Sequence, residues 1–318
     1  MKRAIIISLA LLTLLACGGR TEKKSQEPTT PSAKTQSASN SVKEPAAFIP
    51  ALPPALLSAE QKMEFMREHY WDKFDFSDTT FLSRIDSTKM LTAFAVYAGG
   101  YMQDSLAYRY MPRLMQRAST SKRMYTYFLM LAENVLHDPN SPLRSDEKYI
   151  PVLESAVQSQ WLDEYERMPY EYDLEMARQN RVGHIANDFT YTLASGRTGK
   201  MHNIKANYTL IFISNPGCPM CGDVKEQIIS SPMLQELAER KELKVLVIYP
   251  DADLEAWREH LEDYPASWIN AYDADLRIDK ERLYDLKAIP ALYLLDSQKR
   301  VLAKDCTDVA YIEKLLSE

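Results

Sequence analysis

Apolar positions recur with two different spacings along the chain. Between residues 57 and 180 they recur every three or four positions, which is the spacing of amphipathic helices. Prolines and the Asn140-Ser141 pair divide this stretch into several predicted helices; the prolines are Pro112, Pro139, Pro142 and Pro151. From residue 181 the apolar positions instead form short β-branched runs separated by helical stretches. The pattern predicts an all-α helical region at 57–180 and an α/β domain at 181–318.

Two apolar runs form the centre of the predicted α/β domain. They span 209–214 and 244–249, with a predicted helix at 222–229 between them. Parallel strands need such a crossover, so we expect the two runs to pair in parallel. A hairpin is expected before them, with strands at 188–193 and 200–204. After them we expect helices at 233–243, 253–264 and 308–316, and strands at 267–272 and 300–304.

A Cys-x-x-Cys motif stands between the first run and the predicted helix. Cys218 and Cys221 follow a turn at 215–217 and lead into that helix. The amino end of a helix carries unpaired N–H groups and a partial positive charge, which favour a thiolate at Cys218. Cys221 would lie one turn further on, within reach of a mixed disulfide. We therefore predict a redox centre with Cys218 as nucleophile and Cys221 as resolving thiol.

Two other interpretations of this cysteine pair are open. A structural zinc site would need a second pair of ligands, but the remaining cysteines are Cys17 and Cys306 and the five histidines show no ligand spacing. A static structural disulfide is the second alternative, which the strand-turn-helix context disfavours. No metal and no cofactor is predicted, because the chain also lacks a Gly-rich phosphate-binding loop.

A proline marks the start of another predicted strand. Pro290 lies in the apolar run 288–296, directly after Ile289. Proline is tolerated in a central strand at its first residue or in a cis bond. We therefore expect Pro290 to open this strand, and 300–304 to return beside it in the antiparallel direction.

The amino terminus has the pattern of an export signal. Lys2-Arg3 precedes an apolar segment at 4–12, which is too short to span a bilayer. The following Leu14-Leu15-Ala16-Cys17 resembles a bacterial lipobox, which implies cleavage before Cys17 and lipidation of that cysteine. An ordinary secretory signal with a chance cysteine is the alternative. By resemblance to known sorting patterns, Gly18 and the lack of an acidic run after it imply the periplasmic face of the outer membrane.

The next segment, 18–56, is predicted to be a disordered tether. It is rich in Ser, Thr, Pro, Lys, Gln and Glu and has no helical periodicity. Residues 1–17 are assigned to the lipoprotein signal region, in which Cys17 carries the lipid. Of the four cysteines, only Cys306 then remains outside the Cys-x-x-Cys motif. So few cysteines in an oxidising compartment indicate a catalytic pair, not a disulfide-stapled scaffold. Cys306, near the end of a predicted strand, is either a third redox partner or an inert small apolar residue, and we favour the inert role.

The helical region at 57–180 offers no catalytic constellation. Its many tyrosines and methionines could line an aromatic peptide-binding groove. Their helical spacing is more typical of core packing, which we therefore predict.

Taken together, the motifs in 181–318 resemble a thioredoxin-fold domain of the TlpA type. The resemblance rests on the hairpin, on Cys218-Pro219-Met220-Cys221, and on Ile289-Pro290 about seventy residues later, followed by a closing strand and helix. It implies that Pro290 is cis and stacked against the cysteines, and that the Ile289 backbone pairs with an incoming substrate strand. The helical region is similar to an uncharacterised domain that precedes such modules in secreted lipoproteins.

Four positions depart from that family pattern: Gly217 stands where many relatives carry Trp, Ala291 replaces a common Thr, and Val224 and Phe212 bear on the resolving thiol. Val224 stands where several TlpA-type reductases place a Glu, and Phe212 where thioredoxins bury an Asp. Both acids assist proton transfer at the resolving sulfur. Without them, deprotonation of Cys221 is expected to rely on water, on Asp223 or on Glu226.

Charge excludes one class of partner. A net charge of −6 and a pI near 5.6 disfavour nucleic acid, whose binding needs a basic face. We expect a lipid-anchored periplasmic thiol–disulfide oxidoreductase that acts on cysteines of exported proteins and exchanges electrons with an unidentified membrane partner. Pro219-Met220 indicates an intermediate reduction potential, so the direction of electron flow stays open. The alternatives are a non-catalytic binding or assembly lipoprotein with this fold as scaffold, and a peroxiredoxin, which Asn215 in place of the usual Thr disfavours.

Overall fold

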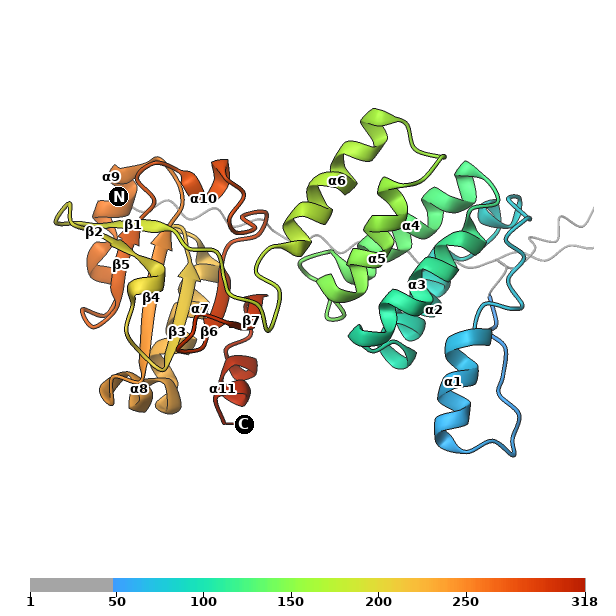
Figure 1. Cartoon of the computed structure of the whole chain (residues 1–318), viewed down its shortest axis with the longest axis horizontal. Helices are drawn as coiled ribbons and strands as arrows, with labels where there is room; N and C mark the ends of the chain where they lie inside the picture. Colours follow the sequence, from blue (N-terminus) through green and yellow to red (C-terminus); the bar gives the residue numbers. More distant parts are fainter. Residues whose placement is uncertain (1–47, 318) are drawn as a thin grey trace, which may run out of the picture. The chain divides into compact units, whose positions relative to one another are not determined.

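The structure, a computed structural model, describes residues 48–317 (Figure 1). The predicted signal segment, Cys17 and most of the predicted tether lie outside the described residues. The first half of the described chain is helical, as predicted. Its elements are α1 (Ala59–His69), η1 (Phe81–Ser83), α2 (Ser87–Val96), η2 (Tyr97–Tyr101), α3 (Asp104–Ala118), α4 (Lys122–Leu136), α5 (Asp146–Val157) and α6 (Glu164–Arg178).

Two of the four prolines that were predicted to separate helices instead lie inside them. Pro139 and Pro142 lie between α4 and α5, but Pro112 and Pro151 lie inside α3 and α5 and do not end them. An internal proline removes one backbone hydrogen bond. The buried apolar face of α3, which includes Met111 and Leu114, offsets that loss, because most helix stability in proteins comes from packing.

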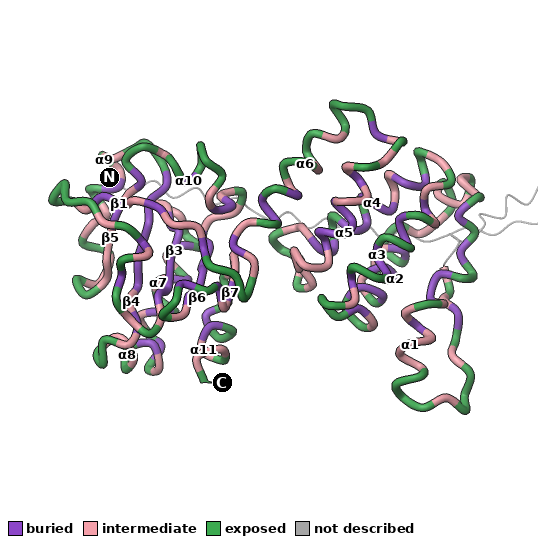
Figure 2. Tube along the Cα trace, in the orientation of Figure 1, coloured by how far each residue is buried: buried purple, intermediate pink, exposed green. Residues whose placement is uncertain are grey.

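Aromatic side chains dominate the core of the helical region. Phe128 of α4 is fully buried and its ring lies 5.4 Å from Trp71, 5.4 Å from Phe74 and 5.3 Å from Phe76. Figure 2 shows the buried positions recurring along α3, α4 and α5. Many of the tyrosines and methionines belong to this core and are buried, as the helical spacing predicted: Tyr70, Tyr97, Tyr110, Tyr125, Tyr149, Met90, Met111, Met115 and Met124.

The second half of the described chain is built on a seven-stranded sheet with the order β2-β1-β5-β4-β3-β6-β7. The pairs β3–β4 and β4–β5 are parallel, and the other pairs are antiparallel. The strands are β1 (Thr190–Leu193), β2 (Thr198–Lys200), β3 (Tyr208–Ile213), β4 (Leu243–Tyr249), β5 (Ile269–Tyr272), β6 (Ala291–Leu295) and β7 (Val301–Cys306). The predicted parallel pairing of the two central runs is therefore confirmed.

Both faces of the sheet are covered, which explains why its central strands are continuously apolar. On β3, Leu210 and Phe212 pack with α7 (Pro219–Ser230), α8 (Pro232–Glu239) and α11 (Val309–Ser317). The alternate residues Ile211 and Ile213 face the other side. The remaining helical elements are η3 (Met201–Asn203), α9 (Leu254–Glu259), η4 (Leu261–Asp263) and α10 (Arg277–Lys280).

The largest departures from the predicted bounds concern two elements. The hairpin's return strand, expected at 200–204, is β2 at Thr198–Lys200, and the residues after it form η3, because Met201 is buried and Asp188 accepts the His202 N–H at 2.9 Å. The helix expected over 253–264 ends at Glu259, with η4 after it. Tyr264, which follows η4, is extended, as expected for the residue before Pro265, because that position avoids helical backbone angles.

Polar contacts join α5 and α6 to the last strand. Lys304 of β7 pairs with Asp146 at 2.6 Å and donates to the Ala177 carbonyl at 2.9 Å. Asp305 accepts a short hydrogen bond from Arg144. None of these contacts involves a cysteine side chain.

Candidate active site

The redox motif stands at a junction between strand and helix. After β3 ends, the Ser214 N–H donates to the Ile248 carbonyl at 3.1 Å and keeps the chain beside β4 for one more residue. Gly217 then adopts a φ of +69°, which glycine reaches without strain. Cys218 is the N-cap of α7, and its Sγ accepts the Cys221 N–H at 3.3 Å. The strand-turn-helix arrangement predicted for the motif is what the structure has.

Its two thiols have different surroundings. Cys218 is partly exposed, whereas Cys221 is only 3% exposed and shares the buried face of α7 with Val224 and Ile228. Both cysteines are free thiols in this structure. A substrate can therefore reach Cys218 first, and Cys221 is positioned one helical turn behind it.

Burial controls the protonation of Cys221. It raises the pKa of this thiol to about 11, with a further rise from the neighbouring Cys218. The Asn215 backbone and the Ser214 side chain act in the opposite direction and lower the pKa of the thiol. At neutral pH Cys221 is therefore protonated and must lose a proton before it can act as a nucleophile.

The hydroxyl of Ser214 is part of this site. Ser214 is 2% exposed, and its Oγ lies 2.9 Å from the Tyr264 hydroxyl. Tyr264 follows η4 and its ring packs near Phe212 and Trp268. The sequence analysis missed both residues. A serine that ends an apolar run could have signalled Ser214, but Tyr264 is fifty residues away and no local pattern points to it.

The proline of the predicted site immediately precedes β6, which pairs with β3. The Ile289–Pro290 peptide bond is cis, as the resemblance implied. Pro290 is buried and immediately precedes Ala291, which pairs with Ile213 at the end of β3. Ile289 is partly buried against the same cluster as Cys218 and Cys221. The predicted contact of its backbone with a substrate strand remains a prediction.

Asp223 and Glu226, the predicted proton-transfer residues, lie elsewhere. Both are exposed, and Glu226 pairs with Lys225 at 3.6 Å. Cys221 belongs to the opposite, buried face of the same helix. The structure does not bring either carboxylate together with the resolving thiol, so their proposed role has no geometric support.

Cys306 ends β7 at the edge where β6 begins. It pairs with Leu292, two residues after Pro290, and is partly buried against the cluster that contains the redox cysteines. Burial raises the pKa of its thiol to about 12. Such a thiol is a poor nucleophile, which favours the inert role.

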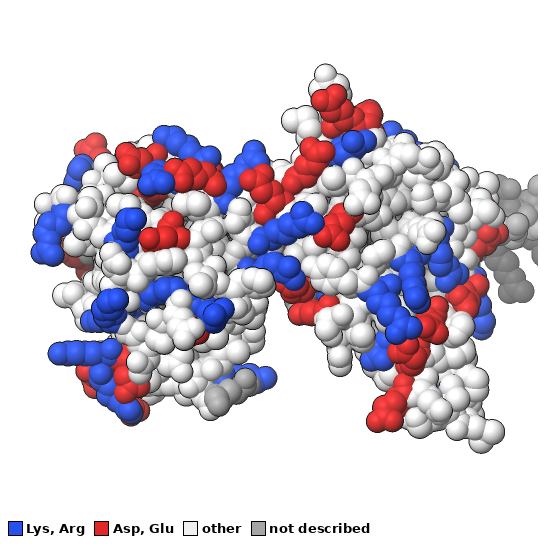
Figure 3. All heavy atoms as spheres, in the orientation of Figure 1, with Lys and Arg blue, Asp and Glu red and all other residues white. Residues whose placement is uncertain are grey.

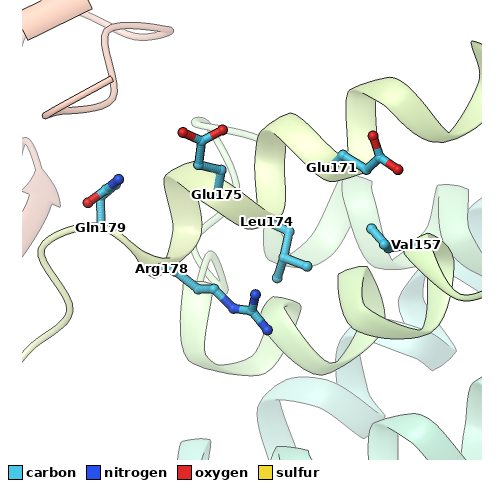
Figure 4. Close-up of a pocket in the computed structure, with 6 residues that line it drawn as sticks. All are labelled: Val157, Glu171, Leu174, Glu175, Arg178 and Gln179. Atoms are coloured by element: carbon cyan, nitrogen blue, oxygen red, sulfur yellow. The ribbon is translucent and has the colours of Figure 1, made fainter. Parts of the chain in front are cut away.

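Hollows on the helical region contain none of the cysteines. One has a volume of about 330 Å³ and is lined by residues of α5 and α6 and by Gln179 (Figure 4). Its Arg178 pairs with Glu154 at 2.6 Å, and its Glu175 pairs with Arg282. A second hollow of about 540 Å³ lies beside Pro112 and Pro151. Ion pairs therefore already occupy Arg178 and Glu175, two of the charged groups of the first hollow.

The described residues show neither a cluster of metal ligands nor a helix that could cross a membrane. In residues 48–317, no three His, Cys, Asp or Glu side chains gather where they could hold a metal ion. None of the helices in that range combines the length and apolar character needed to cross a membrane.

Fold and site together define a class. A central β3–β4 parallel pair, a Cys-x-x-Cys motif at the amino end of α7 and a cis-proline before β6 are the features of a thioredoxin-like protein. Family models agree: residues 206–301 match the family described as thioredoxin-like, and residues 16–180 match the domain of unknown function DUF5106. The chain belongs to the DUF5106 family, in which it carries a thioredoxin-like domain after the helical one.

Several solved structures of proteins from Bacteroides are similar to this chain. A thioredoxin-like protein from Bacteroides caccae is 40% identical, with 86% of this chain and 98% of that chain covered and a TM-score of 0.80. The C-terminal domain of an uncharacterized protein from Bacteroides fragilis is 47% identical over 44% of this chain and 99% of its own, with a TM-score of 0.43. The thioredoxin domain of a thiol-disulfide oxidoreductase from Bacteroides vulgatus is 19% identical over 42% of this chain and 96% of its own, with a TM-score of 0.36. No curated protein matches the sequence. The predicted fold class, a helical region followed by a thioredoxin-like α/β domain, is confirmed.

Proposed function

We propose that this protein is a thiol–disulfide oxidoreductase that exchanges the Cys218–Cys221 pair with cysteines of exported proteins. One observation carries the proposal: a partly exposed Cys218 caps α7, with a buried Cys221 one turn behind it and cis-Pro290 beside the same sheet edge. A purely structural pair would not need one sulfur exposed and the other shielded. The arrangement supports two successive nucleophilic steps.

In the reducing direction, the Cys218 thiolate attacks one sulfur of a substrate disulfide. A bond forms between those two sulfurs, the substrate's own S–S bond breaks, and one substrate thiolate leaves. Cys221 then loses its proton to water and attacks the Cys218 sulfur, which forms the Cys218–Cys221 disulfide and releases the second substrate thiolate. Two electrons pass to the substrate, and its thiolates take up protons from water. The same steps in reverse oxidise a substrate dithiol.

The surface supports a protein as substrate. Figure 3 shows acidic and basic side chains interspersed over the visible face, and the net charge is −6. A nucleic-acid partner would instead call for a concentrated basic surface. Protein thiols and disulfides are the partner class we propose.

We place the mature protein at the periplasmic face of the outer membrane, held by a lipid on Cys17. The export signal and the lipobox-like Leu14-Leu15-Ala16-Cys17 support this location. In that oxidising compartment, repeated turnover as a reductant would need a membrane electron donor, and turnover as an oxidant would need an acceptor. Labelling with radioactive palmitate in cells tests the anchor: wild type should carry the label and Cys17→Ser should not.

The function is tested by reduction of insulin disulfides with dithiothreitol as the electron source. Wild-type protein should accelerate insulin precipitation, and Cys218→Ser should abolish the acceleration. Cys221→Ser should accumulate a mixed disulfide with the substrate, because the second attack is missing. Cys306→Ser is the matched control and should retain wild-type activity. Full activity in Cys218→Ser would refute the proposal and favour a binding or assembly role.

A further inference from the structure

Residues 282–289 form an irregular segment that ends at the redox site. They lie between α10 and β6 and contain no helix or strand. Because β6 is antiparallel to β3 and Ala291 pairs with Ile213, the residues before Ala291 extend in the same direction as those after β3, where the cysteine motif begins. Ile289 and Cys218 are both partly buried on the same apolar cluster. The end of the segment is therefore part of the surface around Cys218.

Few backbone hydrogen bonds hold this segment. The Leu283 N–H donates to the Ile278 carbonyl at 2.9 Å, but no backbone–backbone hydrogen bond involves residues 284–289 of the described chain. A segment without a ladder of such bonds opens at low cost in free energy unless side chains restrain it. The position of residues 284–289 therefore depends on side-chain contacts.

Asn180, the last residue of the helical region, supplies one of these contacts. It is only 5% exposed, and its φ of +48° is an angle that asparagine adopts more readily than most residues. Its side-chain amide donates to the Leu283 carbonyl at 2.7 Å, and its Oδ1 accepts the Asn187 N–H at 2.7 Å. The Asn187 amide donates to the same Leu283 carbonyl at 3.0 Å. A buried side chain at the end of the helical region is thus bonded at both its polar atoms to the thioredoxin-like domain.

Helix α6 makes a second contact, with the first residue of the segment. The Arg282 guanidinium lies 4.9 Å from the centre of the Tyr172 ring and forms an ion pair with Glu175. Figure 4 shows Glu175 and Arg178 pointing to different sides of α6, so this pair is separate from the one that Arg178 forms with Glu154. Each contact is weak at an exposed site, but both act on the same guanidinium.

We propose that the helical region positions residues 282–289 and thereby sets the affinity of the redox site for protein substrates. Asn180 holds the Leu283 carbonyl, and α6 holds Arg282. A protein whose disulfide reaches Cys218 also contacts the surface around that thiol, and a restrained segment costs less entropy to order on binding than a mobile one. Asn180 is therefore a positioning residue for substrate binding. The inference rests on the proposed function and involves none of the aromatic core of the helical region.

The affinity for a protein substrate can be measured separately from the reactivity of the thiols. Initial rates of insulin reduction with dithiothreitol, over a range of insulin concentrations, give KM and kcat for a protein disulfide. The small disulfide 5,5′-dithiobis(2-nitrobenzoate) reports the rate at which Cys218 attacks. Both assays use the full chain with Cys17→Ser and Cys306→Ala, which leaves only the motif cysteines. A contact that positions a protein substrate should change the KM and leave the rate with the small disulfide unchanged.

The substitution Asn180→Asp removes the amide donor with little change in shape. The bond to the Leu283 carbonyl is then lost, so the KM for insulin should rise about fivefold, as expected for one buried hydrogen bond, while kcat and the small-disulfide rate stay at wild-type values. Hydrogen exchange of residues 282–289, followed by mass spectrometry, should become faster. Asn134→Asp is the matched control, because its amide donates to the Met130 carbonyl at 2.7 Å on α4, and it should behave as wild type.

Exchange of charges tests the contact from α6. Glu175→Arg places two cations side by side and should raise the KM for insulin about threefold. The double variant Glu175→Arg, Arg282→Glu restores opposite charges and should return the KM towards the wild-type value. Glu154→Arg, which breaks the ion pair with Arg178, is the matched control and should leave the KM unchanged.

Two results with Asn180→Asp would overturn the proposal. One is a KM at the wild-type value, and the other is an equal loss of activity towards insulin and towards the small disulfide, which indicates general damage to the fold. If Asn180→Asp fails to fold, Glu175→Arg decides, because a wild-type KM there, or no recovery in the double variant, overturns the proposal as well.

Failure of the proposed function gives a different result. Wild-type protein that reacts with the small disulfide but does not reduce insulin would refute the function. Hydrogen exchange then tests the positioning by itself: faster exchange of residues 282–289 in Asn180→Asp supports it, and unchanged exchange refutes it.

Discussion

Two tyrosine hydroxyls, one in each half of the described chain, show that the same group can have different partners. In the helical region, Tyr70 is buried and donates to the Ala93 carbonyl at 2.8 Å, and burial raises the pKa of its phenol to about 12. In the thioredoxin-like domain, burial also raises the pKa of the partly buried Tyr264, whose hydroxyl lies 2.9 Å from Ser214 Oγ. The first hydroxyl bonds to the backbone of the helical core, whereas the second bonds to a buried side chain just after β3, the strand that leads into the cysteine motif.

The contrast extends to the two regions as wholes. The helical region buries large aromatic side chains, and none of its polar contacts reaches a thiol of the described chain. In the thioredoxin-like domain, the cysteine motif and Pro290 lie at one end of two neighbouring interior strands, where β3 ends and β6 begins. Substitutions in the aromatic core should therefore change the free energy of unfolding, whereas substitutions at the cysteine site should change the rate of thiol–disulfide exchange.

The largest expected effect breaks the aromatic core without touching the cysteines. Phe128→Ala should destabilise the helical region by about 3–5 kcal/mol, the usual cost of removing a buried phenylalanine ring. Urea unfolding followed by circular dichroism measures the loss. Under native conditions the rate of insulin reduction should stay at the wild-type value. If that rate falls in step with the loss of stability, the separation of the two regions is wrong.

A smaller effect concerns pH and the resolving thiol. The pKa of Cys221 is raised from 9.0 to about 11 in the folded protein, so between these pH values the folded state holds a proton that the unfolded state has lost. This contribution to stability is complete below pH 9 and is lost as the pH rises towards 11. We expect it to be of order 1 kcal/mol once solvent screening is allowed for.

Urea unfolding of the reduced protein at pH 8 and pH 11 tests this expectation. Cys221→Ala should lose less stability over this range than wild type does. The same pH dependence in both proteins would mean that burial does not hold the proton on Cys221.

The smallest expected effect concerns Tyr70, the tyrosine of the helical region. Tyr70→Phe removes the bond to Ala93 and should cost about 0.5–1.5 kcal/mol of unfolding free energy, with the rate of insulin reduction unchanged. Urea unfolding and the insulin assay measure the two quantities. A loss of insulin reduction in this variant would contradict the separation of the two regions.

The sequence predicted those features that are local in the chain. Cys218 at the start of α7, the parallel β3–β4 pair and the strand opened by Pro290 each follow from a short stretch of residues, and the structure has all three. Pro112 inside α3 was not foreseen, because tertiary packing outweighed the local penalty of the proline.

The residues that surround the resolving thiol could not be predicted in the same way. The bond between Ser214 and Tyr264 joins residues fifty positions apart, and it exists only because the chain beyond η4 folds back over the end of β3. Asp223 and Glu226 were attractive candidates because they are close to Cys221 in sequence. The helical period places them on the exposed side of α7 instead.

The most direct test of the account is a redox titration of the wild-type protein against dithiothreitol, with the thiols mapped by mass spectrometry. The account predicts one reversible two-electron transition, with a midpoint between about −270 and −120 mV, in which Cys218 and Cys221 become linked to each other and Cys306 stays free. A midpoint near the lower value would indicate a reductant and one near the upper value an oxidant. The absence of a reversible Cys218–Cys221 couple, or a disulfide that includes Cys306 in its place, would contradict the account.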